Sequence, residues 1–450
     1  MLRSSPDAPP PRHHRADGLA VVHPHQHPVV PITRYARGAP PGPVRHNEPV
    51  TTPPTSSTDA VTALARRLDR CPAHEVASVV VEHVRRTVGA RDVVLLVANL
   101  EQTELVPVPA SGSPRSTARG IDEDDGTALR TGEAERSPLE EADTGDGGPA
   151  EELWRLPVEH DGERIGVLEL VAPTGTDRDL LQALATTAGR ALMASARTSD
   201  HLESLRRTQL MTPGAELLAS VLPPSSAVSG PVSVAALLEP TYSTGGDAYD
   251  YALDEDVAHL AIFDATGHGF PAAVVSSIAV AAYRNSRYAE HDLATAYLAM
   301  DAVVGDHSGE ARFVTGLMLQ LDPGTGRVEW LSAGHPCPVL VGADGSLRAL
   351  EAEPEPPLGT GLAGAATPDV GEDFLEPGDV LVLFTDGITE ARDLEGGMLG
   401  VAGLAEIVHR LSGAGLTPAE LVRQVGVELQ ERDDVWMSDD ATALLVRWDG

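Results

Sequence analysis

Residues 245–273 read GGDAYDYALDEDVAHLAIFDATGHGFPAA, and this stretch decides the fold of the second half of the chain. Two apolar, strand-like runs flank the acidic segment from Asp254 to Asp256, which has the composition of a turn. If the runs pair as an antiparallel hairpin, Asp247 and Asp264 lie opposite each other, with Cβ atoms roughly 4.5–5.5 Å apart. Two carboxylates this close repel each other unless a proton or a cation lies between them. A slip of one residue would place them on opposite faces, so the register decides whether the pair exists.

Two more strand ends in the same half of the chain carry aspartate. Asp386 follows VLVLFT at 380–385, which is apolar on both faces and therefore predicts a buried central strand. Asp439 and Asp440 directly precede the apolar run ATALLV at 441–446. A single aspartate next to a turn is usually a solvated turn residue. Acidic side chains at the ends of several apolar strands instead predict a common site for a pair of divalent cations, which lie about 3.5–4 Å apart in hydrolytic sites.

Length and charge limit the classes of function. A chain of 450 residues predicts two folded domains with linkers. A formal net charge of −34 argues against nucleic acid and anionic membrane as partners. The sequence contains no lysine, which excludes a P-loop, a protein kinase and Schiff-base chemistry. Cys71 and Cys337 have no CxxC partner, and no apolar run is long enough to span a bilayer, so we expect a cytoplasmic protein.

The first half of the chain predicts a tail and a small mixed domain. Residues 1–58 are rich in Pro, His, Ser and Thr without periodicity, which predicts a disordered tail. Residues 59–196 contain helical patterns, a short apolar strand at 93–97, and two alternating runs around Asp161-Gly162 that predict a hairpin. This order of elements, together with ALRTGE at 128–133, resembles a GAF sensory domain. The resemblance implies either a small-molecule ligand or a scaffold for a homodimer, and no residue identifies a ligand.

Residues from Asp177 to about Leu222 have Ala and Leu at helical spacing and predict a long helix or a pair interrupted at Pro213-Gly214. We assign 197–222 to a helical linker. A parallel dimeric stalk between sensor and effector and a helix packed on its own domain both remain open.

Residues 223–450 contain strand-like runs punctuated by turns, with helical stretches at 271–289 and 293–304 and a pair between 401 and 429. Hairpinned strands with segregated helices predict an α+β layered sandwich.

The motifs of this half, in order, resemble the PPM-type phosphatases of the protein phosphatase 2C superfamily, and most closely the bacterial branch typified by the sporulation stage II E phosphatase. They are LLASVLPP, GGDAYDY, FDATGHGFPAA, LSAGHPCP, PPLG, LFTDGITEA and DDATALLV. The resemblance implies an αββα sandwich with two Mn²⁺ or Mg²⁺ ions. It implies that Asp247, Asp264, Asp386 and Asp439 are the catalytic, metal-binding aspartates. The carbonyl of Ala265 is a further expected ligand, and Asp440, the neighbour most easily confused with Asp439, is included in the expected metal set. Carboxylate and carbonyl oxygens are independently the ligands that these two cations prefer.

The resemblance also implies an activity. It predicts a metal-dependent phosphoserine/phosphothreonine protein phosphatase (a phosphoric monoester hydrolase) in signal transduction. We expect control by the GAF-like sensor and a phosphorylated anti-sigma-factor antagonist as the substrate, in a partner-switching pathway for sigma factor regulation. Thr266 stands where the eukaryotic branch has a histidine that can act as general acid, and that role is not transferred to His268. His335 in AGHP is interpreted as structural.

Two other classes of function are weighed. The chain could be a catalytically silent phosphatase-fold module that sequesters a signalling partner. GGD also resembles the start of the diguanylate cyclase signature, but Ala248 follows it where that signature has an acidic residue, and the later motifs disfavour a cyclase.

Overall fold

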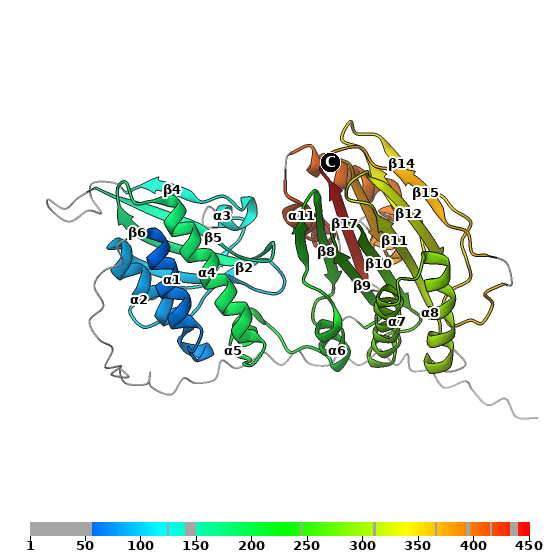
Figure 1. Cartoon of the computed structure of the whole chain (residues 1–450), viewed down its shortest axis with the longest axis horizontal. Coiled ribbons are helices and arrows are strands. Elements are labelled where there is room, and N and C mark those ends of the chain that lie inside the picture. The colour runs from blue at the N-terminus through cyan, green and yellow to red at the C-terminus, as the bar shows by residue number, and fades with distance from the viewer. Residues whose placement is uncertain are drawn as a thin grey trace, which may run out of the picture.

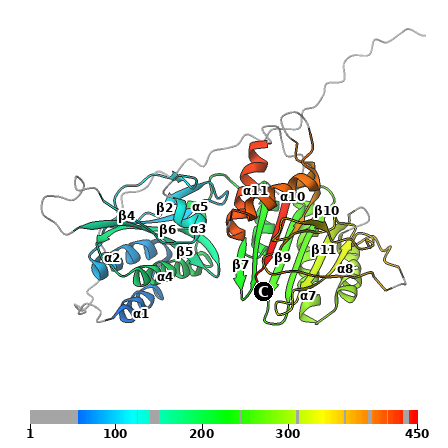
Figure 2. The same ribbon diagram turned by 90° about the horizontal axis from the view of Figure 1, so that it is seen from above.

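The computed structural model describes residues 56–123, 126–139, 150–243, 245–308, 312–364, 367–392, 397–414, 416–432 and 440–450. They form two domains that lie side by side (Figures 1 and 2). The expected disordered tail at 1–58 falls almost entirely outside these residues, since the described part begins at Ser56.

The N-terminal domain is built on one sheet with the strand order β3-β2-β1-β6-β5-β4. Its strands are β1 (Arg91–Ala98), β2 (Glu104–Pro107), β3 (Arg119–Gly120), β4 (Glu135–Pro138), β5 (Glu151–His160) and β6 (Glu163–Pro173). The predicted hairpin at Asp161-Gly162 is confirmed, and both residues have the positive φ that a tight hairpin turn requires. Apolar residues of α1 (Ser57–Leu68), α2 (Val76–Val88) and α4 (Arg178–Ala196) form a single core with one face of this sheet. The short helices η1 (Ala73–Glu75) and α3 (Thr127–Thr131) complete the domain.

The segment between the domains consists of short helices instead of one long helix or a pair broken only at Pro213. After α4 come α5 (His201–Arg206) and α6 (Pro213–Val221), and Pro213 begins α6. Leu181, Leu184, Leu192 and Leu202 are buried in the core of the N-terminal domain. The apolar faces of α4 and α5 are therefore covered by their own domain, which is the second of the two alternatives.

The C-terminal domain contains two sheets. The strand order of the first is β15-β12-β11-β10-β9 and that of the second is β14-β13-β16-β17-β8-β7. The first comprises β9 (Asp247–Leu253), β10 (Ala258–Ala265), β11 (Val314–Leu321), β12 (Arg327–Ala333) and β15 (Gly371–Phe374). The second comprises β7 (Ser226–Ser229), β8 (Val232–Glu239), β13 (Val339–Val341), β14 (Leu347–Ala349), β16 (Val380–Phe384) and β17 (Ala441–Trp448).

The two sheets pack face to face with helices on both outer faces, which confirms the predicted αββα sandwich. Leu260, Ile262 and Leu383 belong to the apolar core between the sheets. α7 (Phe270–Tyr288) and α8 (Leu293–Ser308) cover the first sheet. α9 (Asp386–Glu390), α10 (Gly400–Ser412) and α11 (Pro418–Arg432) cover the second. In the part of the chain that the structure describes, no helix is long and apolar enough to cross a membrane.

Candidate metal centre

The predicted pair of opposed carboxylates exists. In the β9–β10 ladder Asp264 is the partner of Asp247, and Asp254 and Val257 close the turn between the strands. Side chains alternate between the faces of a strand, so Asp264 shares a face with Ile262, which packs between the two sheets. Both aspartates therefore lie at the edge of the space between the sheets, and Asp247 is only 2% exposed.

The environment of Asp247 disfavours its charged form. Burial raises the pKa of its carboxyl well above its usual range, and the facing Asp264 raises it further. The hydrogen bond that the hydroxyl of Thr385 donates acts in the opposite direction but does not cancel the increase. A buried acid with a second acid across from it needs either a proton or a cation, and a divalent cation can stabilise both carboxylates at once.

Thr385 connects Asp247 to the second sheet. Its hydroxyl donates to Oδ2 of Asp247 at 2.6 Å and accepts from the backbone N–H of Thr442 at 2.9 Å. Thr385 is completely buried at the end of β16, directly before Asp386. The carboxylate from the first sheet is thus held in place by the strand that delivers the next aspartate.

Asp440 organises the loop that precedes Asp247. Its Oδ2 accepts hydrogen bonds from the backbone N–H groups of Gly245 at 2.9 Å and Gly246 at 2.6 Å, and a longer one from Asp247 at 3.4 Å. Hydrogen bonds to an ionised acceptor are stronger than those between neutral groups. Asp440 therefore couples the start of β17 to the GGD loop, 195 residues away in sequence.

Asp386 lies at the same edge of the sandwich. An added Cβ on the following residue, Gly387, would lie 1.9 Å from the backbone carbonyl oxygen of Asp440, so the two segments are in direct contact. The carboxyl of Asp386 is accessible to solvent but partly buried, and this burial, together with Glu390, raises its pKa.

Gly246 leaves room for oxygen atoms at the centre of this arrangement. A Cβ at this position would lie 3.2 Å from the carbonyl oxygen of Ala265 and 3.4 Å from Oδ2 of Asp440. These contacts are tight for a carbon atom, and any larger side chain would enter the space between the carbonyl and the carboxylate. The absence of a side chain here keeps these oxygens accessible.

The predicted residues are therefore brought together to different extents. Asp247 and Asp264 face each other, while Ala265, Asp386 and Asp440 lie on the segments around them. Asp439 lies outside the described residues, directly before Asp440. Among the described residues alone, no group of three or more His, Cys, Asp or Glu side chains has the arrangement of a metal site.

The residues that hold these aspartates were not found by sequence reasoning. Thr385 was treated as the last residue of an apolar strand, and Ser276 as part of an apolar helix, although its hydroxyl donates to the carbonyl of Gly246. A hydroxyl residue next to a strand-end aspartate, as in TDG, was the available signal. The contacts themselves depend on how the two sheets and α7 pack.

Thr266 has a structural role in this geometry. Its hydroxyl donates to the carbonyl of Phe313 and accepts from the backbone N–H of the same residue, both at 3.1 Å. It therefore closes the end of the β10–β11 ladder. His268, two residues further on, is exposed in the turn before α7.

Comparisons with known proteins agree with this architecture. Residues 254–449 match the family model of the stage II sporulation protein E (SpoIIE), and residues 72–192 match that of the GAF domain. The phosphoserine phosphatase RsbU of Bacillus subtilis is 26% identical over 223 residues, which are 48% of this chain and 63% of that protein.

Solved structures with similarity include the RsbU and RsbW domains of a Mycobacterium tuberculosis protein. That chain is 28% identical, with 49% of this chain and 62% of the other covered and a TM-score of 0.41. The PP2C phosphatase domain of SpoIIE from Bacillus subtilis, solved with a fragment of its regulatory domain, is 14% identical. The match covers 72% of this chain and 84% of the other, with a TM-score of 0.42. The chain spans less than two thirds of the length of RsbU and of the Mycobacterium tuberculosis chain.

The order of the domains and the two packed sheets agree with both matches: residues 72–192 match the GAF domain model, and residues 254–449, a domain with a PP2C-like fold, match the model of the stage II sporulation protein E.

Proposed function

We propose that the chain is a metal-dependent protein phosphatase that hydrolyses phosphoserine or phosphothreonine. The observation that carries this proposal is the register of β9 and β10, which places Asp247 opposite Asp264 at the open edge between two sheets. Asp386 and Asp440 reach the same edge from the second sheet. The similarity to a phosphoserine phosphatase supports the same reaction.

The residues fit Mn²⁺ or Mg²⁺. The candidate ligands are the carboxylates of Asp247, Asp264, Asp386 and Asp439 and the carbonyl of Ala265, and all of these are hard oxygen donors. Two such cations would lower the pKa of a bound water and neutralise charge on the transferred phosphoryl group. The raised pKa of Asp247 shows that the site without a cation is unfavourable for two anions.

Other residues of the chain position these ligands. Thr385 orients Asp247 through its hydroxyl, and Asp440 holds the GGD backbone in the conformation that directs Asp247 between the sheets. We therefore assign Asp440 to the support of the site and Asp439 to direct metal binding. Because the hydroxyl of Thr266 is bound to the backbone of Phe313, we infer that the leaving serine or threonine oxygen takes its proton from solvent.

A phosphatase assay on the purified full-length chain tests this function. We expect hydrolysis of p-nitrophenyl phosphate and of a phosphoserine protein with Mn²⁺, and loss of the activity with EDTA. Asp264→Asn and Asp386→Asn should each lower kcat by at least a hundredfold, and Asp256→Asn, an exposed turn residue, is the matched control. Activity that survives both EDTA and Asp386→Asn would refute the metal mechanism. A wild-type chain that binds Mn²⁺ but hydrolyses no phosphoprotein would favour the silent binding module.

The substrate that we propose is a phosphorylated anti-sigma-factor antagonist in a partner-switching pathway. The name of RsbU and the resemblance of the motifs support this choice, and it depends on analogy with the family. Comparing the phosphoproteomes of cells with the wild-type chain and with Asp386→Asn would identify the protein whose phosphoserine accumulates.

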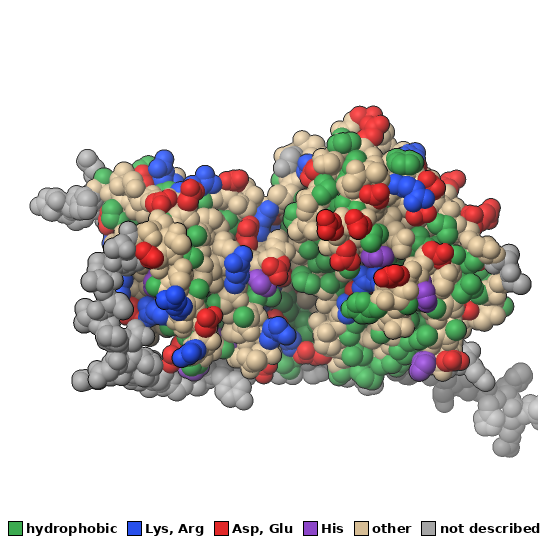
Figure 3. All heavy atoms as spheres, in the orientation of Figure 1, with side chains coloured by type: hydrophobic (Ala, Val, Ile, Leu, Met, Phe, Trp, Pro, Cys, Tyr) green, Lys and Arg blue, Asp and Glu red, His purple; other side chains and the backbone are tan. Residues whose placement is uncertain are grey.

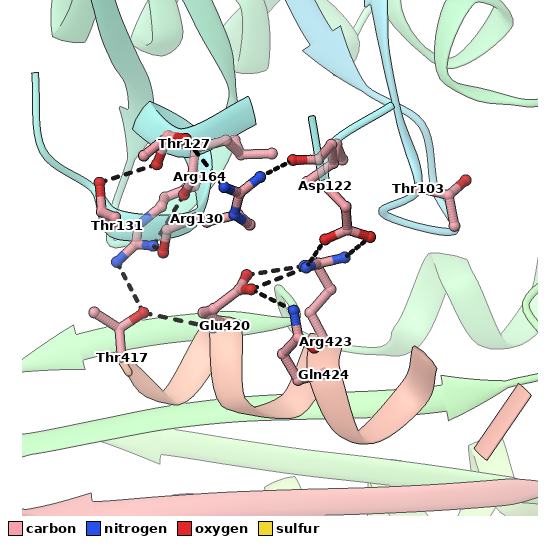
Figure 4. A network of polar contacts seen from close by, with 12 residues as sticks. Thr103, Asp122, Thr127, Arg130, Thr131, Arg164, Thr417, Glu420, Arg423 and Gln424 are labelled. Atoms are coloured by element: carbon pink, nitrogen blue, oxygen red, sulfur yellow. Dashed lines mark hydrogen bonds and ion pairs between the residues drawn. The ribbon is translucent and has the colours of Figure 1, made fainter. Parts of the chain in front are cut away.

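We further propose that the GAF domain regulates the phosphatase domain through direct contacts. The guanidinium of Arg423 on α11 is 2.6 Å from Oδ1 of Asp122 in the GAF domain and is also bound to Glu420 (Figure 4). Arg164 on β6 of the GAF domain donates to Oγ1 of Thr417, directly before α11, at 3.0 Å (Figure 4). The side chain of Arg423 is only 7% exposed, whereas that of Asp122 is 63% exposed, so this ion pair lies at the rim of the contact with its Asp122 side open to water.

A second contact reaches the segment in front of Asp247. The hydroxyl of Tyr242 donates to the carboxylate of Glu101, in the loop between β1 and β2, at 2.8 Å. The surface is hollowed between the two domains, and residues of both line this cavity of about 620 Å³ (Figure 3). The GAF domain therefore contacts both α11 and Tyr242. In the chain, α11 precedes Asp439 and Asp440, and Tyr242 precedes Gly245. These two segments meet in the hydrogen bonds of Asp440 with Gly245 and Gly246.

Charge reversal tests this regulatory contact. Asp122→Arg and Arg423→Asp should each change the apparent Mn²⁺ affinity or kcat of the full-length chain by a factor of three or more. The double variant should restore the wild-type value because the ion pair is rebuilt in the opposite sense. Asp69→Arg, an exposed residue at the C-terminal end of α1, controls for added positive charge. No change in the single variants, or no recovery in the double variant, would contradict coupling through this contact.

A further inference from the structure

His335 lies where the chain passes from one sheet to the other. It follows β12 of the first sheet and precedes β13 of the second, and it is 5% exposed. The hydroxyl of Ser332 accepts from the backbone N–H of His335 at 3.1 Å and donates to its carbonyl at 2.7 Å. The backbone at this position is therefore fixed, and so is the direction in which the imidazole leaves it.

The imidazole connects the two sheets. Its Nε2 is 3.0 Å from the backbone carbonyl oxygen of Phe384 in β16, and its Nδ1 is 2.8 Å from Oγ1 of Thr315 in β11. A carbonyl can only accept, so Nε2 carries the hydrogen, and Nδ1 of the neutral ring accepts from the hydroxyl of Thr315. Burial lowers the pKa of His335 to about 4, in agreement with a neutral ring.

Both partners of the ring lie next to candidate metal ligands. Thr315 is the direct partner of Asp264 in the β10–β11 ladder. Phe384 precedes Thr385, whose hydroxyl holds Asp247, and Asp386 follows. One side chain thus spans the gap between the strand that pairs with Asp264 and the strand that leads to Asp386.

We propose that His335 is a positioning residue that sets the separation of the two sheets at the metal centre and thereby the affinity for the cations, without contacting metal or substrate. This inference depends on the proposed metal-dependent phosphatase. A metal site requires its ligands within about 0.2 Å of the preferred distances. Apart from this link and the hydrogen bond of Thr385 with Asp247, apolar side chains fill much of the space between the sheets, and such side chains tolerate small shifts. A fully satisfied polar link, in contrast, favours one arrangement.

The test separates metal affinity from stability in the full-length, metal-free chain. We would measure the Kd for Mn²⁺ by titration calorimetry and the stability by urea unfolding. His335→Leu and Thr315→Val should each weaken Mn²⁺ binding 10- to 100-fold, the range seen when residues that orient metal ligands are removed. Thr315→Ser keeps the hydroxyl, so its Kd for Mn²⁺ should stay within about threefold of the wild-type value. This change is smaller than the tenfold effect at the lower end of that range.

A second buried histidine provides the control for a purely structural role. His83 in the GAF domain is also buried, and its Nε2 lies 2.9 Å from the carbonyl oxygen of Ala60. His83→Leu should lower the stability and leave the Kd for Mn²⁺ unchanged. A Kd within twofold of wild type in Thr315→Val would overturn the proposal, and this holds even if His335→Leu fails to fold. A wild-type chain that binds no Mn²⁺ would refute the proposed function and, with it, this role of His335. That outcome can be distinguished from failure of the His335 proposal alone, because it is measured on the wild-type chain before any variant is made.

Discussion

At the scale of single residues, the buried carboxyl of Asp247 controls the electrostatics of the site. Its pKa is raised well above the ordinary value by burial and by the facing Asp264. An acid whose pKa is raised in the folded state favours folding at low pH and loses this contribution as the pH rises through the raised pKa. The metal-free chain should therefore become less stable between acidic and neutral pH, and a divalent cation should restore the loss.

Asp247→Asn should reveal this effect. In EDTA at neutral pH, where the wild-type chain must either keep a proton on Asp247 or bury an unpaired charge, the variant should be more stable by roughly 1–3 kcal/mol. Near pH 4 the difference should disappear. Mn²⁺ should raise the Tm of the wild-type chain and have little effect on the variant, and calorimetric scans at both pH values measure these differences. An equal response of both chains to Mn²⁺ would contradict the role of Asp247 as a ligand.

Thr385 offers a second prediction at this scale. Thr385→Val removes the hydroxyl that donates to Asp247 and accepts from Thr442 but keeps the shape of the side chain. We expect a loss of about 1–3 kcal/mol, because a buried acceptor and a buried donor lose their partner. Thr385→Ser keeps both hydrogen bonds and should lose less, as urea unfolding of the two variants would show. Equal losses in both variants would mean that packing of the methyl group matters more than the hydrogen bonds.

At the scale of elements, ion pairs with a buried aspartate hold helix α7 against β9. Asp250 of β9 is completely buried and forms ion pairs with Arg284 at 2.6 Å and Arg287 at 2.7 Å, both on α7. Arg284 also donates to the carbonyl of Val221 at the end of α6 at 2.8 Å. Asp250 and Arg284 therefore link β9, α7 and α6. Asp250 lies three residues beyond Asp247 on β9.

Asp250→Asn should be strongly destabilising. The substitution leaves two guanidinium groups without their anion, and breaking a buried ion pair on one side costs about 3–5 kcal/mol. We expect a lower midpoint of urea unfolding and faster hydrogen exchange in α7. Asp256→Asn, in the exposed turn of the same hairpin, should change neither. A loss below about 1 kcal/mol, which is typical of surface pairs, would show that water compensates the two arginines.

At the scale of the whole molecule, the two domains share a polar interface beside α11. Arg423 is bound from both sides, by Glu420 of its own helix and by Asp122 of the GAF domain (Figure 4). Burial lowers the pKa of its guanidinium, but the hydrogen bonds with Glu420 and Asp122 outweigh this effect and raise it overall. The interface is therefore charged and hydrogen-bonded, a composition typical of domain contacts that can rearrange.

We expect binding at the metal centre to be transmitted to the GAF domain. Mn²⁺ should slow the hydrogen exchange of GAF segments around Asp122 and Glu101 in the wild-type chain, because coupling between two sites is reciprocal. In Arg423→Gln this protection around Asp122 should be lost, while the protection of β9 and β10 by Mn²⁺ persists. Mass spectrometry of exchanged peptides measures both regions in one experiment. Unchanged GAF protection in Arg423→Gln would show that the coupling runs through another contact.

Much of this architecture could be predicted from the sequence because its signals are local. Two apolar, strand-like runs predicted β9 and β10, and two alternating runs predicted the GAF hairpin. The acidic segment from Asp254 to Asp256 identified the turn between β9 and β10. The short edge strands β7, β14 and β15 were not predicted from the sequence. They contain only three or four residues and are partly exposed, so neither their length nor their burial leaves a periodic pattern.

Contacts between distant segments could be decided only by the tertiary structure. The bond of Thr385 with Asp247 joins residues 138 apart, and that of Asp440 with Gly245 joins residues 195 apart. The alternation of side chains along one strand determines which face a residue occupies, and the acidic turn suggests how the two strands pair. The sequence alone therefore predicted the opposed carboxylates, and the observed register fixed them. The partners across two packed sheets, the link through His335 and the docking of the GAF domain on α11 depend instead on how complete faces fit together, which no local pattern encodes.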